Sequence, residues 1–311
     1  MEAKSPTLPR GATLPAAKTG TRTRGALATA RDYLMLTKPR VISLLLLTTV
    51  TTMFVADPSG PALSTILWTV LGGYMAAGGA GAINHYLERE ADARTARTSA
   101  RPLASGRIEP WKGLAFGIAL GSLATAQLGL TVNTLAAVLA AGGLLGYVFL
   151  YTLWLKPRTP LNIVLGGAAG AMPPLVGWAA ATGELSAQAL WLFAIVFFWT
   201  PPHFWALSLL IADDYARNGV PMLPVVRGEQ TTRRQILGYS VLMVAITVGP
   251  VITGLFGALY LVSALALGAG FIALAASLSR HPSKTSARRL YLSSLAYLAL
   301  LFIAMAVDRA A

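Results

Sequence analysis

The sequence contains no cysteine, and charged residues are scarce in it. The absence of cysteine excludes thiolate catalysis, iron–sulfur clusters, cysteine-ligated zinc and disulfide bonds. Only 12% of the 311 residues are charged, with 12 Asp and Glu against 25 Lys and Arg, and histidine occurs three times. With 55% hydrophobic residues, this composition falls outside that of soluble globular proteins and indicates a membrane protein.

Nine apolar runs approach or reach the roughly 20 residues that a helix needs to cross a hydrocarbon core of about 30 Å. We therefore predict an all-α integral membrane protein with about nine transmembrane helices around a central cavity. Residues 1–32 are predicted to form a disordered cytoplasmic tail, and residues 33–311 a single transmembrane domain. The runs are residues 41–56, 62–84, 111–129, 133–153, 161–181, 187–211, 236–255, 258–277 and 289–307.

Nearly all basic residues lie on one predicted side of the membrane. Nine alternating helices place 24 of the 25 Lys and Arg there, with Arg309 as the exception. By the positive-inside rule this side is the cytoplasm, so we predict a multi-pass protein of a bacterial inner (plasma) membrane with its N-terminus inside. The mitochondrial inner membrane is the less favoured alternative. The net charge of +13 is thus explained by topology, and we predict no nucleic-acid partner.

An unusual group of charged residues begins at Asn84, where the second apolar run ends. If that helix continues, Asn84, Glu88 and Asp92 recur every four residues and line one face. Two carboxylates and an amide suit a hard cation such as Mg²⁺, and the nearby Arg97 and Arg101 suit phosphate oxygens. The alternative is a solvated helix end with Glu–Arg pairs. Because ionisable clusters at membrane depth are costly, we predict a metal–diphosphate site.

A second acidic segment follows the sixth apolar run and contains Asp213, Asp214, Tyr215 and Asn218. Adjacent aspartates cannot share one helix face, so at most one of them is expected to bind metal. The alternative is a helix end that leads into a structured loop. The spacing of four helices between the two acidic segments suggests a weak internal duplication, with the two loops facing each other across the cavity.

Three basic residues and two histidines stand near these segments. Lys38, Lys156 and Arg158 lie at predicted membrane boundaries, where they serve as topology anchors or, beside a shared cavity, as diphosphate ligands. His203 lies among aromatic residues, which suits either a structural hydrogen bond or a haem pocket. His85 adjoins the acidic face.

Two proline pairs lie inside apolar runs, at Pro173–Pro174 and Pro201–Pro202. Because proline lacks a backbone N–H and its ring clashes with the preceding turn, each pair is predicted to break its helix. Broken helices at membrane depth are tolerated where they line a cavity. The second pair is of particular interest because it directly precedes His203.

Over about residues 33–308 the chain resembles the UbiA superfamily of membrane prenyltransferases. The general motif is N-x-x-x-D-x-x-x-D, here Asn84, Glu88 and Asp92, with Glu88 in place of the usual Asp. The second motif of members that act on hydroxybenzoate or naphthoate, D-x-x-x-D, fails because Asn218 follows Asp214. Longer strings are similar to the haem O synthase (protohaem IX farnesyltransferase) branch, namely LTKPRVISLLLLTT, LKPRTPLNIVLGGAAGAMPPLVGWAA and WTPPHFWALSLLIADDYARNGVPMLPVVRGEQTTRRQ.

The resemblance implies Mg²⁺-dependent transfer of a farnesyl group from farnesyl diphosphate to a vinyl group of haem b, which forms haem O for haem A and terminal oxidase biogenesis. It implies haem A synthase as a candidate partner, beside the lipid bilayer. The implied residue roles are catalytic metal binding by Asn84, Glu88 and Asp92 with Asp213 or Asp214, diphosphate binding by Lys38, Arg97, Arg101, Lys156 and Arg158, and haem binding by His203 or His85.

Two alternative functions share some of these features. One is a prenyltransferase for an aromatic quinone precursor, which would use the same acidic face. The other, of a different class, is a secondary transporter of an anionic metabolite, since transporters also use broken helices and buried charges. The gathering of charges at one membrane face, rather than at mid-membrane, favours the enzyme.

Overall fold

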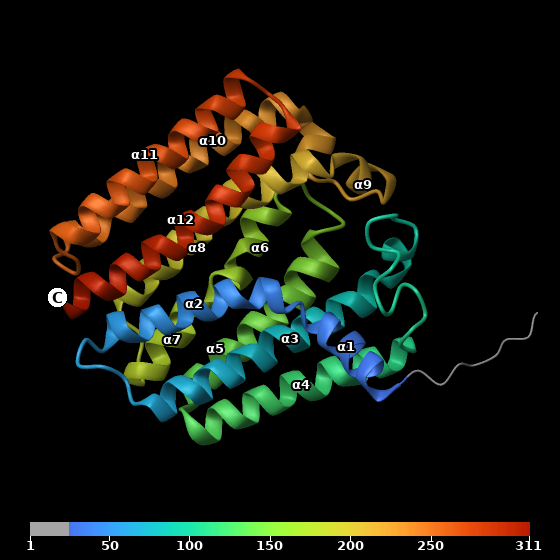
Figure 1. Ribbon diagram of the computed structural model, residues 1–311, viewed down its shortest axis with the longest axis horizontal. Coiled ribbons are helices and arrows are strands. Elements are labelled where there is room, and N and C mark those ends of the chain that lie inside the picture. Colours follow the sequence, from blue (N-terminus) through green and yellow to red (C-terminus); the bar gives the residue numbers. More distant parts are fainter. Residues whose placement is uncertain (1–24) are drawn as a thin grey trace, which may run out of the picture.

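The computed structural model describes residues 25–311, and within that range the chain forms helices joined by loops (Figure 1). The predicted disorder of residues 1–24 lies outside the described residues. In chain order the helices are α1 (Ala26–Thr37), α2 (Pro39–Ala56), α3 (Leu63–Ala93), α4 (Pro110–Thr131), α5 (Thr134–Leu145), the π-helix η1 (Gly146–Leu155), α6 (Asn162–Gly170), α7 (Met172–Thr182), α8 (Ala187–Leu210), α9 (Ala212–Arg217), α10 (Leu223–Ile252), α11 (Ala258–Arg280) and α12 (Lys284–Ala310).

Within the described residues, nine helical segments are long and apolar enough to cross a membrane, which confirms the predicted helical membrane fold. Two of these spans consist of two helices each: α5 continues into η1, and α6 is followed by α7. The short helices α1 and α9 lie near the same end of the bundle (Figure 1). Because α1 begins at Ala26, the segment predicted as a tail is helical from there onward.

Two helix boundaries differ from the apolar runs. Helix α3 continues to Ala93, so its polar end shares the axis of its apolar part. Helix α10 begins at Leu223 rather than at residue 236, and α9 precedes it, so most of the segment between the sixth and seventh apolar runs is helical. The extension is polar, carries an Arg233–Glu229 ion pair of 3.0 Å at i,i+4 spacing, and kinks at Gly228, where φ is 77°. Apolar periodicity alone cannot reveal a helix that leaves the hydrocarbon.

The two proline pairs behave differently. A break at Ala171 separates α6 from α7, and Pro173 lies in the first turn of α7, as predicted. Helix α8 instead runs unbroken through Pro201 and Pro202, so the second predicted break is wrong. Proline at 201 leaves the Phe197 carbonyl without its helical donor, and the Thr200 hydroxyl donates to that carbonyl at 2.8 Å. Such side-chain compensation lets a membrane helix tolerate proline.

Helix α8 packs against α6, α10 and α12, and the largest apolar cluster of the described residues surrounds it. On the other side of the bundle, α3 packs along α4 and α2 along α7. Small residues set the distance between α3 and α4: a Cβ placed on Gly79 would lie 2.8 Å from the Gly117 carbonyl oxygen. This close approach matters because α3 carries the predicted acidic face at its end.

Gly79→Ala is therefore expected to destabilise the protein by about 1–3 kcal/mol, since the backbone of α4 cannot yield to a new methyl group. Gly238→Ala in α10 is the matched control, because a Cβ there meets no atom within 4 Å. Thermal unfolding in detergent should show a lower midpoint for the first variant and an unchanged or raised midpoint for the second. Equal midpoints would show that close α3–α4 packing is not required.

Candidate functional site

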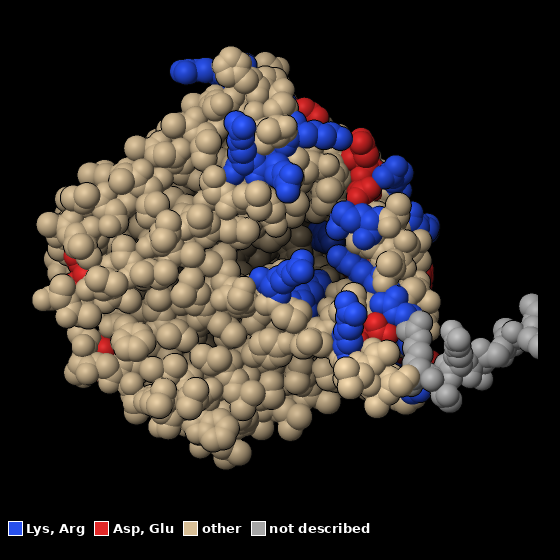
Figure 2. All heavy atoms as spheres, in the orientation of Figure 1, with Lys and Arg blue, Asp and Glu red and all other residues tan. Residues whose placement is uncertain are grey.

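The end of α3 presents three oxygen-bearing side chains on one face. Asn84 and Asp92 are buried, with 2% and 7% of their surface exposed, and the Glu88 side chain is 19% exposed. The continuation of α3 to Ala93 confirms the shared face that their four-residue spacing predicts. Figure 2 shows Lys and Arg side chains gathered at one end of the molecule around a hollow. The acidic face is thus set in a strongly basic region.

Asn84 and Glu88 are each bonded to a lysine from another segment. The Lys38 ammonium donates to Asn84 Oδ1 at 2.6 Å, and Lys156 forms an ion pair with Glu88. Burial lowers the pKa of Lys38 to about 8, although the Glu88 carboxylate opposes this shift. Burial would also lower the pKa of Lys156, but the Glu88 carboxylate outweighs it and the pKa is raised. Both lysines therefore contact the acidic face, as a shared cavity would require.

Lys38 lies between α1 and α2 in a left-handed conformation, with φ 58° and ψ 56°. It is the one non-glycine residue of positive φ within residues 25–311. A side chain in this region costs on the order of 1 kcal/mol, so surrounding contacts must hold it there. The bond to Asn84 is one such contact, and it directs the ammonium onto the α3 face.

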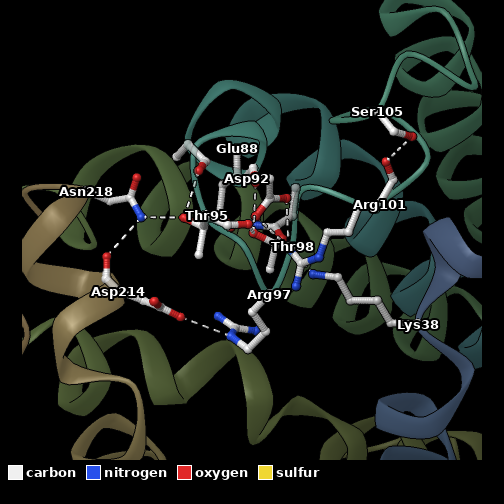
Figure 3. A network of polar contacts seen from close by, with 12 residues as sticks. Lys38, Glu88, Asp92, Thr95, Arg97, Thr98, Arg101, Ser105, Asp214 and Asn218 are labelled. Carbon is white, nitrogen blue, oxygen red and sulfur yellow. Dashed lines mark hydrogen bonds and ion pairs between the residues drawn. The ribbon is translucent and has the colours of Figure 1, made fainter.

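Asp92 is held by the loop that follows α3. Arg101 Nη1 donates to both carboxylate oxygens, at 2.9 and 2.8 Å, and Thr98 Oγ1 donates to the Asp92 carbonyl at 3.1 Å. Figure 3 shows Arg101 reaching back toward Asp92, with the Lys38 side chain beside it. Three cations from three segments therefore converge on one helical face.

The π-helix η1 supplies contacts that we did not predict. Asn84 Nδ2 donates to Thr152 Oγ1 at 3.3 Å, and the Thr152 hydroxyl donates to the Tyr147 carbonyl at 2.8 Å. Tyr147 and Tyr151 stack with ring centroids 5.5 Å apart. The i+5 bond from the Lys156 N–H to the Tyr151 carbonyl ends the π-helix and sets the direction of Lys156. A threonine inside an apolar run gives no sequence signal of such a role.

The two acidic segments, which were predicted to face each other across the cavity, are in direct contact. Arg97 Nε lies 3.2 Å from Asp214 Oδ2, and Asn218 Nδ2 donates to Thr95 Oγ1 at 2.8 Å (Figure 3). Arg97 thus contacts a carboxylate of α9, whereas Lys38, Lys156 and Arg101 contact the α3 face. Thr95, like Thr152, was not identified from the sequence.

The remaining residues of the second segment are less enclosed. Asp213 is exposed, and Tyr215 is partly buried, which raises the pKa of its hydroxyl. The Arg217 guanidinium, bonded to Asp214 at 2.6 Å and aided by Arg97, holds the pKa of the Asp214 carboxyl below its usual value. Arg158 donates to the carbonyls of Leu153 and Trp154 at the end of η1 and forms no ion pair with either acidic segment in the described part of the chain.

The two histidines have different surroundings. His203 lies between the rings of Trp199 and Tyr291, at centroid distances of 4.3 and 4.9 Å, and its Nδ1 is 2.6 Å from Ser294 Oγ on α12. Both ring faces and one nitrogen are thereby engaged, which leaves Nε2 for any ligand. His85 Nδ1 is buried without a hydrogen-bond partner in the described structure.

His203→Ala is expected to lower stability by about 2–4 kcal/mol, because it removes a ring stacked on both faces and leaves the buried Ser294 hydroxyl with one partner fewer. Ser294→Ala removes only the hydroxyl and should cost about 1 kcal/mol. Unfolding midpoints of the two variants in detergent measure the difference. A His203→Ala protein as stable as the wild type would exclude this structural role.

The α3 face fits a hard cation in its donor chemistry. Asn84, Glu88 and Asp92 each direct a side-chain oxygen toward a basic side chain. Mg²⁺ prefers oxygen ligands, of which one or two are carboxylates and the rest come from water or phosphate. Among residues 25–311, no group of three His, Asp and Glu could hold a metal by themselves. A metal on this face would therefore need ligands from the amide, from water or from a substrate.

Curated proteins similar to this chain include two with the name protoheme IX farnesyltransferase. The protein of Roseiflexus sp. (strain RS-1) is 56% identical over 279 residues, which are 90% of this chain and 52% of that protein. The protein of Frankia casuarinae is 47% identical over 283 residues, which are 90% of this chain and 98% of that protein. The chain therefore spans about half the length of the first relative and nearly all of the second.

Solved structures and a family model agree on the fold and the family. A structure from work on digeranylgeranylglyceryl phosphate synthase has a TM-score of 0.72 at 19% identity and covers 91% of this chain and 99% of its own. A UbiA homolog from Archaeoglobus fulgidus bound to DMAPP and Mg²⁺ has a TM-score of 0.63 at 16% identity, over 89% and 99%. These likenesses show the fold. The model of the UbiA prenyltransferase family matches residues 45–304, and so the chain belongs to that family.

Proposed function

We propose that the protein transfers a farnesyl group from farnesyl diphosphate to a vinyl group of haem b and so forms haem O. The observation that carries the proposal is the convergence of Lys38, Lys156 and Arg101 on the oxygen-bearing face of α3. Such a site can hold a metal–diphosphate group in place. The names of the Roseiflexus and Frankia relatives support haem b as the acceptor.

Asn84, Glu88 and Asp92 would hold Mg²⁺, which supplies Lewis-acid neutralisation of the diphosphate when bound. That the Archaeoglobus UbiA homolog, which has the same fold, is bound to DMAPP and Mg²⁺ supports a metal–diphosphate site in this fold. When a diphosphate enters, Lys38, Lys156 and Arg101 would exchange their present partners for phosphate oxygens. They would then stabilise the negative charge that develops on the leaving group.

The reaction balances without an oxidant or reductant. The allylic C–O bond breaks, and the diphosphate leaves with the electron pair. The vinyl group of haem b attacks the allylic carbon and forms the new C–C bond, after which water adds its hydroxyl to the other vinyl carbon and a proton is released. The chain's contribution is to hold the diphosphate at the polar end of α3 while apolar helices exclude bulk water from the allylic carbon.

Haem contacts are proposed for His85 and His203. His85 adjoins Asn84 and has an unpartnered buried Nδ1, whereas His203 can offer only Nε2. Ultraviolet–visible spectra of haem b titrated into the wild type, His85→Ala and His203→Ala test both contacts. A bound-haem spectrum that neither substitution changes would remove both histidines as iron ligands.

Incubation of the purified protein with haem b, farnesyl diphosphate and Mg²⁺ tests the function directly, with haem O detected by mass spectrometry. Product with haem b and none with hydroxybenzoate supports the proposal. Prenylation of hydroxybenzoate without haem O would indicate the quinone-precursor activity instead. Uptake of an anionic metabolite into proteoliposomes, with neither product formed, would indicate a transporter.

We also propose that the basic end of the bundle faces the cytoplasm. Since the chain has no cysteine, single introduced cysteines can be labelled without background. Thr285→Cys, in the exposed first turn of α12, is expected to react with an impermeant maleimide only after cells are opened. Ser59→Cys, in the exposed turn between α2 and α3, is expected to react in intact spheroplasts. The reverse pattern would invert the topology.

A further inference from the structure

The loop after α3, residues 94–103, is joined to the second acidic segment by two side-chain contacts. Arg97 pairs with Asp214 in α9, and Asn218, the C-cap residue of α9, donates to Thr95 (Figure 3). Both contacts link residues more than a hundred positions apart in sequence. We call these four residues the clasp.

The orientation of Asn218 in the clasp is fixed by its second bond. Its Nδ2 donates to Thr95 Oγ1 at 2.8 Å and also to the Asp214 carbonyl at 2.9 Å. A carbonyl oxygen can only accept, so the atom that faces both partners must be the amide nitrogen. An asparagine can ligate a metal only through its oxygen. Asn84 on α3 differs, because its oxygen faces a cation.

Asp214 is likewise engaged on both oxygens. Oδ2 pairs with Arg97 and Oδ1 with Arg217, while the neighbouring Asp213 is exposed and in no ion pair of the described structure. At Asn218 the segment thus presents an amide N–H in place of the oxygen that a D-x-x-x-D motif would supply, which weakens its donor set for a hard cation. The face of α3, in contrast, directs three oxygens toward cations.

We propose that Asp214 and Asn218 are positioning residues of the clasp rather than a second metal site, and that the metal binds through the α3 face alone. This proposal rests on the proposed function. The clasp holds the loop that carries Arg101, whose guanidinium contacts Asp92. The clasp thus keeps the Arg101 guanidinium beside Asp92, where the diphosphate would bind.

The number of metal ions per chain tests the first half of the proposal. Mn²⁺ is counted by electron paramagnetic resonance in the presence of a non-hydrolysable thio analogue of farnesyl diphosphate. We expect one Mn²⁺ per chain in the wild type and in Asp214→Asn. Two ions in the wild type, or the loss of an ion in Asp214→Asn, would overturn the proposal. The metal count is made without haem. Its result therefore tests the metal site whether or not the protein forms haem O.

Variants of the hydrogen bond between Asn218 and Thr95 test the second half. Asn218→Ala and Thr95→Val should each raise the KM for farnesyl diphosphate by about threefold to tenfold while kcat stays within about twofold. The double variant should be no worse than either single one, since all three break one bond. Thr95→Ser keeps the hydroxyl and should restore the wild-type KM. An unchanged KM in both single variants would overturn the clasp.

Limited trypsin digestion supplies a readout of the loop itself. In the clasp variants, cleavage after Arg97, which Thr98 follows, should become several-fold faster without substrate. Ser99→Ala is the matched control, since it removes a hydroxyl of the same loop that bonds only to the Ala96 carbonyl. Faster cleavage in this control, or none in the clasp variants, would show that the clasp does not hold the loop.

Discussion

Glu88→Gln is expected to lower turnover about 100- to 1000-fold, with Asp92→Asn close behind it. Both substitutions keep the size of the side chain and an oxygen atom, but each removes a negative charge from the face that would hold Mg²⁺. Losses of this size are typical when one preorganised group that stabilises developing charge is removed. Initial rates of haem O formation over a range of Mg²⁺ concentrations measure the effect, and the apparent Mg²⁺ affinity should fall with kcat.

Glu90→Gln is the matched control for these variants. Glu90 lies on the same helix end but on another face, with 76% of its side chain exposed and Arg89 as its partner. An exposed pair of this kind contributes little, so activity and stability should be unchanged. If Glu88→Gln and Asp92→Asn formed haem O at the full rate, the metal assignment would be excluded, although the proposed function would stand.

Much of the acidic face could be predicted because its signal is local. A four-residue spacing puts Asn84, Glu88 and Asp92 on one helix face wherever the helix continues, and alanine, leucine, glutamate and arginine around them all favour helix. The nine spans were predictable for the same reason, since each is a continuous run in sequence. The helical start at Leu223 was not, because residues 223–235 are too polar to extend the apolar run.

The partners of the acidic face could not be predicted because they depend on distant segments. Lys156 pairs with a residue 68 positions away, and its direction follows from the π-helical register of η1, which periodicity does not reveal. Thr152 shares that register. For Asn218, the sequence showed only that the usual second motif fails, whereas its contact with Thr95 exists only in the folded chain. Haem binding by His203 was suggested by its aromatic neighbours in the sequence. In the folded chain one of them, Trp199, stacks on the imidazole, and so does Tyr291 from the distant helix α12.

In the free protein, the basic side chains of the site form ion pairs with its own carboxylates. Lys156 and Arg101 neutralise Glu88 and Asp92, so a charged cluster can exist at the edge of the membrane without a ligand. A diphosphate and its metal would bring negative and positive charge between these pairs, so that the cations could bind the phosphate oxygens and the carboxylates the metal. The pairs therefore contribute to stability in the free protein and to binding in the complex, and these two roles can be separated by mutation.

Lys156→Met is expected to affect both stability and activity. It leaves the Glu88 carboxylate without its cation, which should cost about 2 kcal/mol, less than for a fully buried pair because nearly a fifth of each side chain is exposed. It also removes a charge that would stabilise the leaving diphosphate, so kcat should fall about 100-fold. Thermal unfolding in detergent and haem O formation measure the two effects.

The double variant Lys156→Met/Glu88→Gln distinguishes the two roles. Removing both charges leaves no uncompensated carboxylate, so stability should return to within about 1 kcal/mol of the wild type. Activity should stay at or below that of either single variant, because the metal ligand and the diphosphate ligand are both gone. Lys156→Arg, which keeps the charge, should retain full stability and part of the activity. Recovery of activity in the double variant would mean that Lys156 serves only to neutralise Glu88.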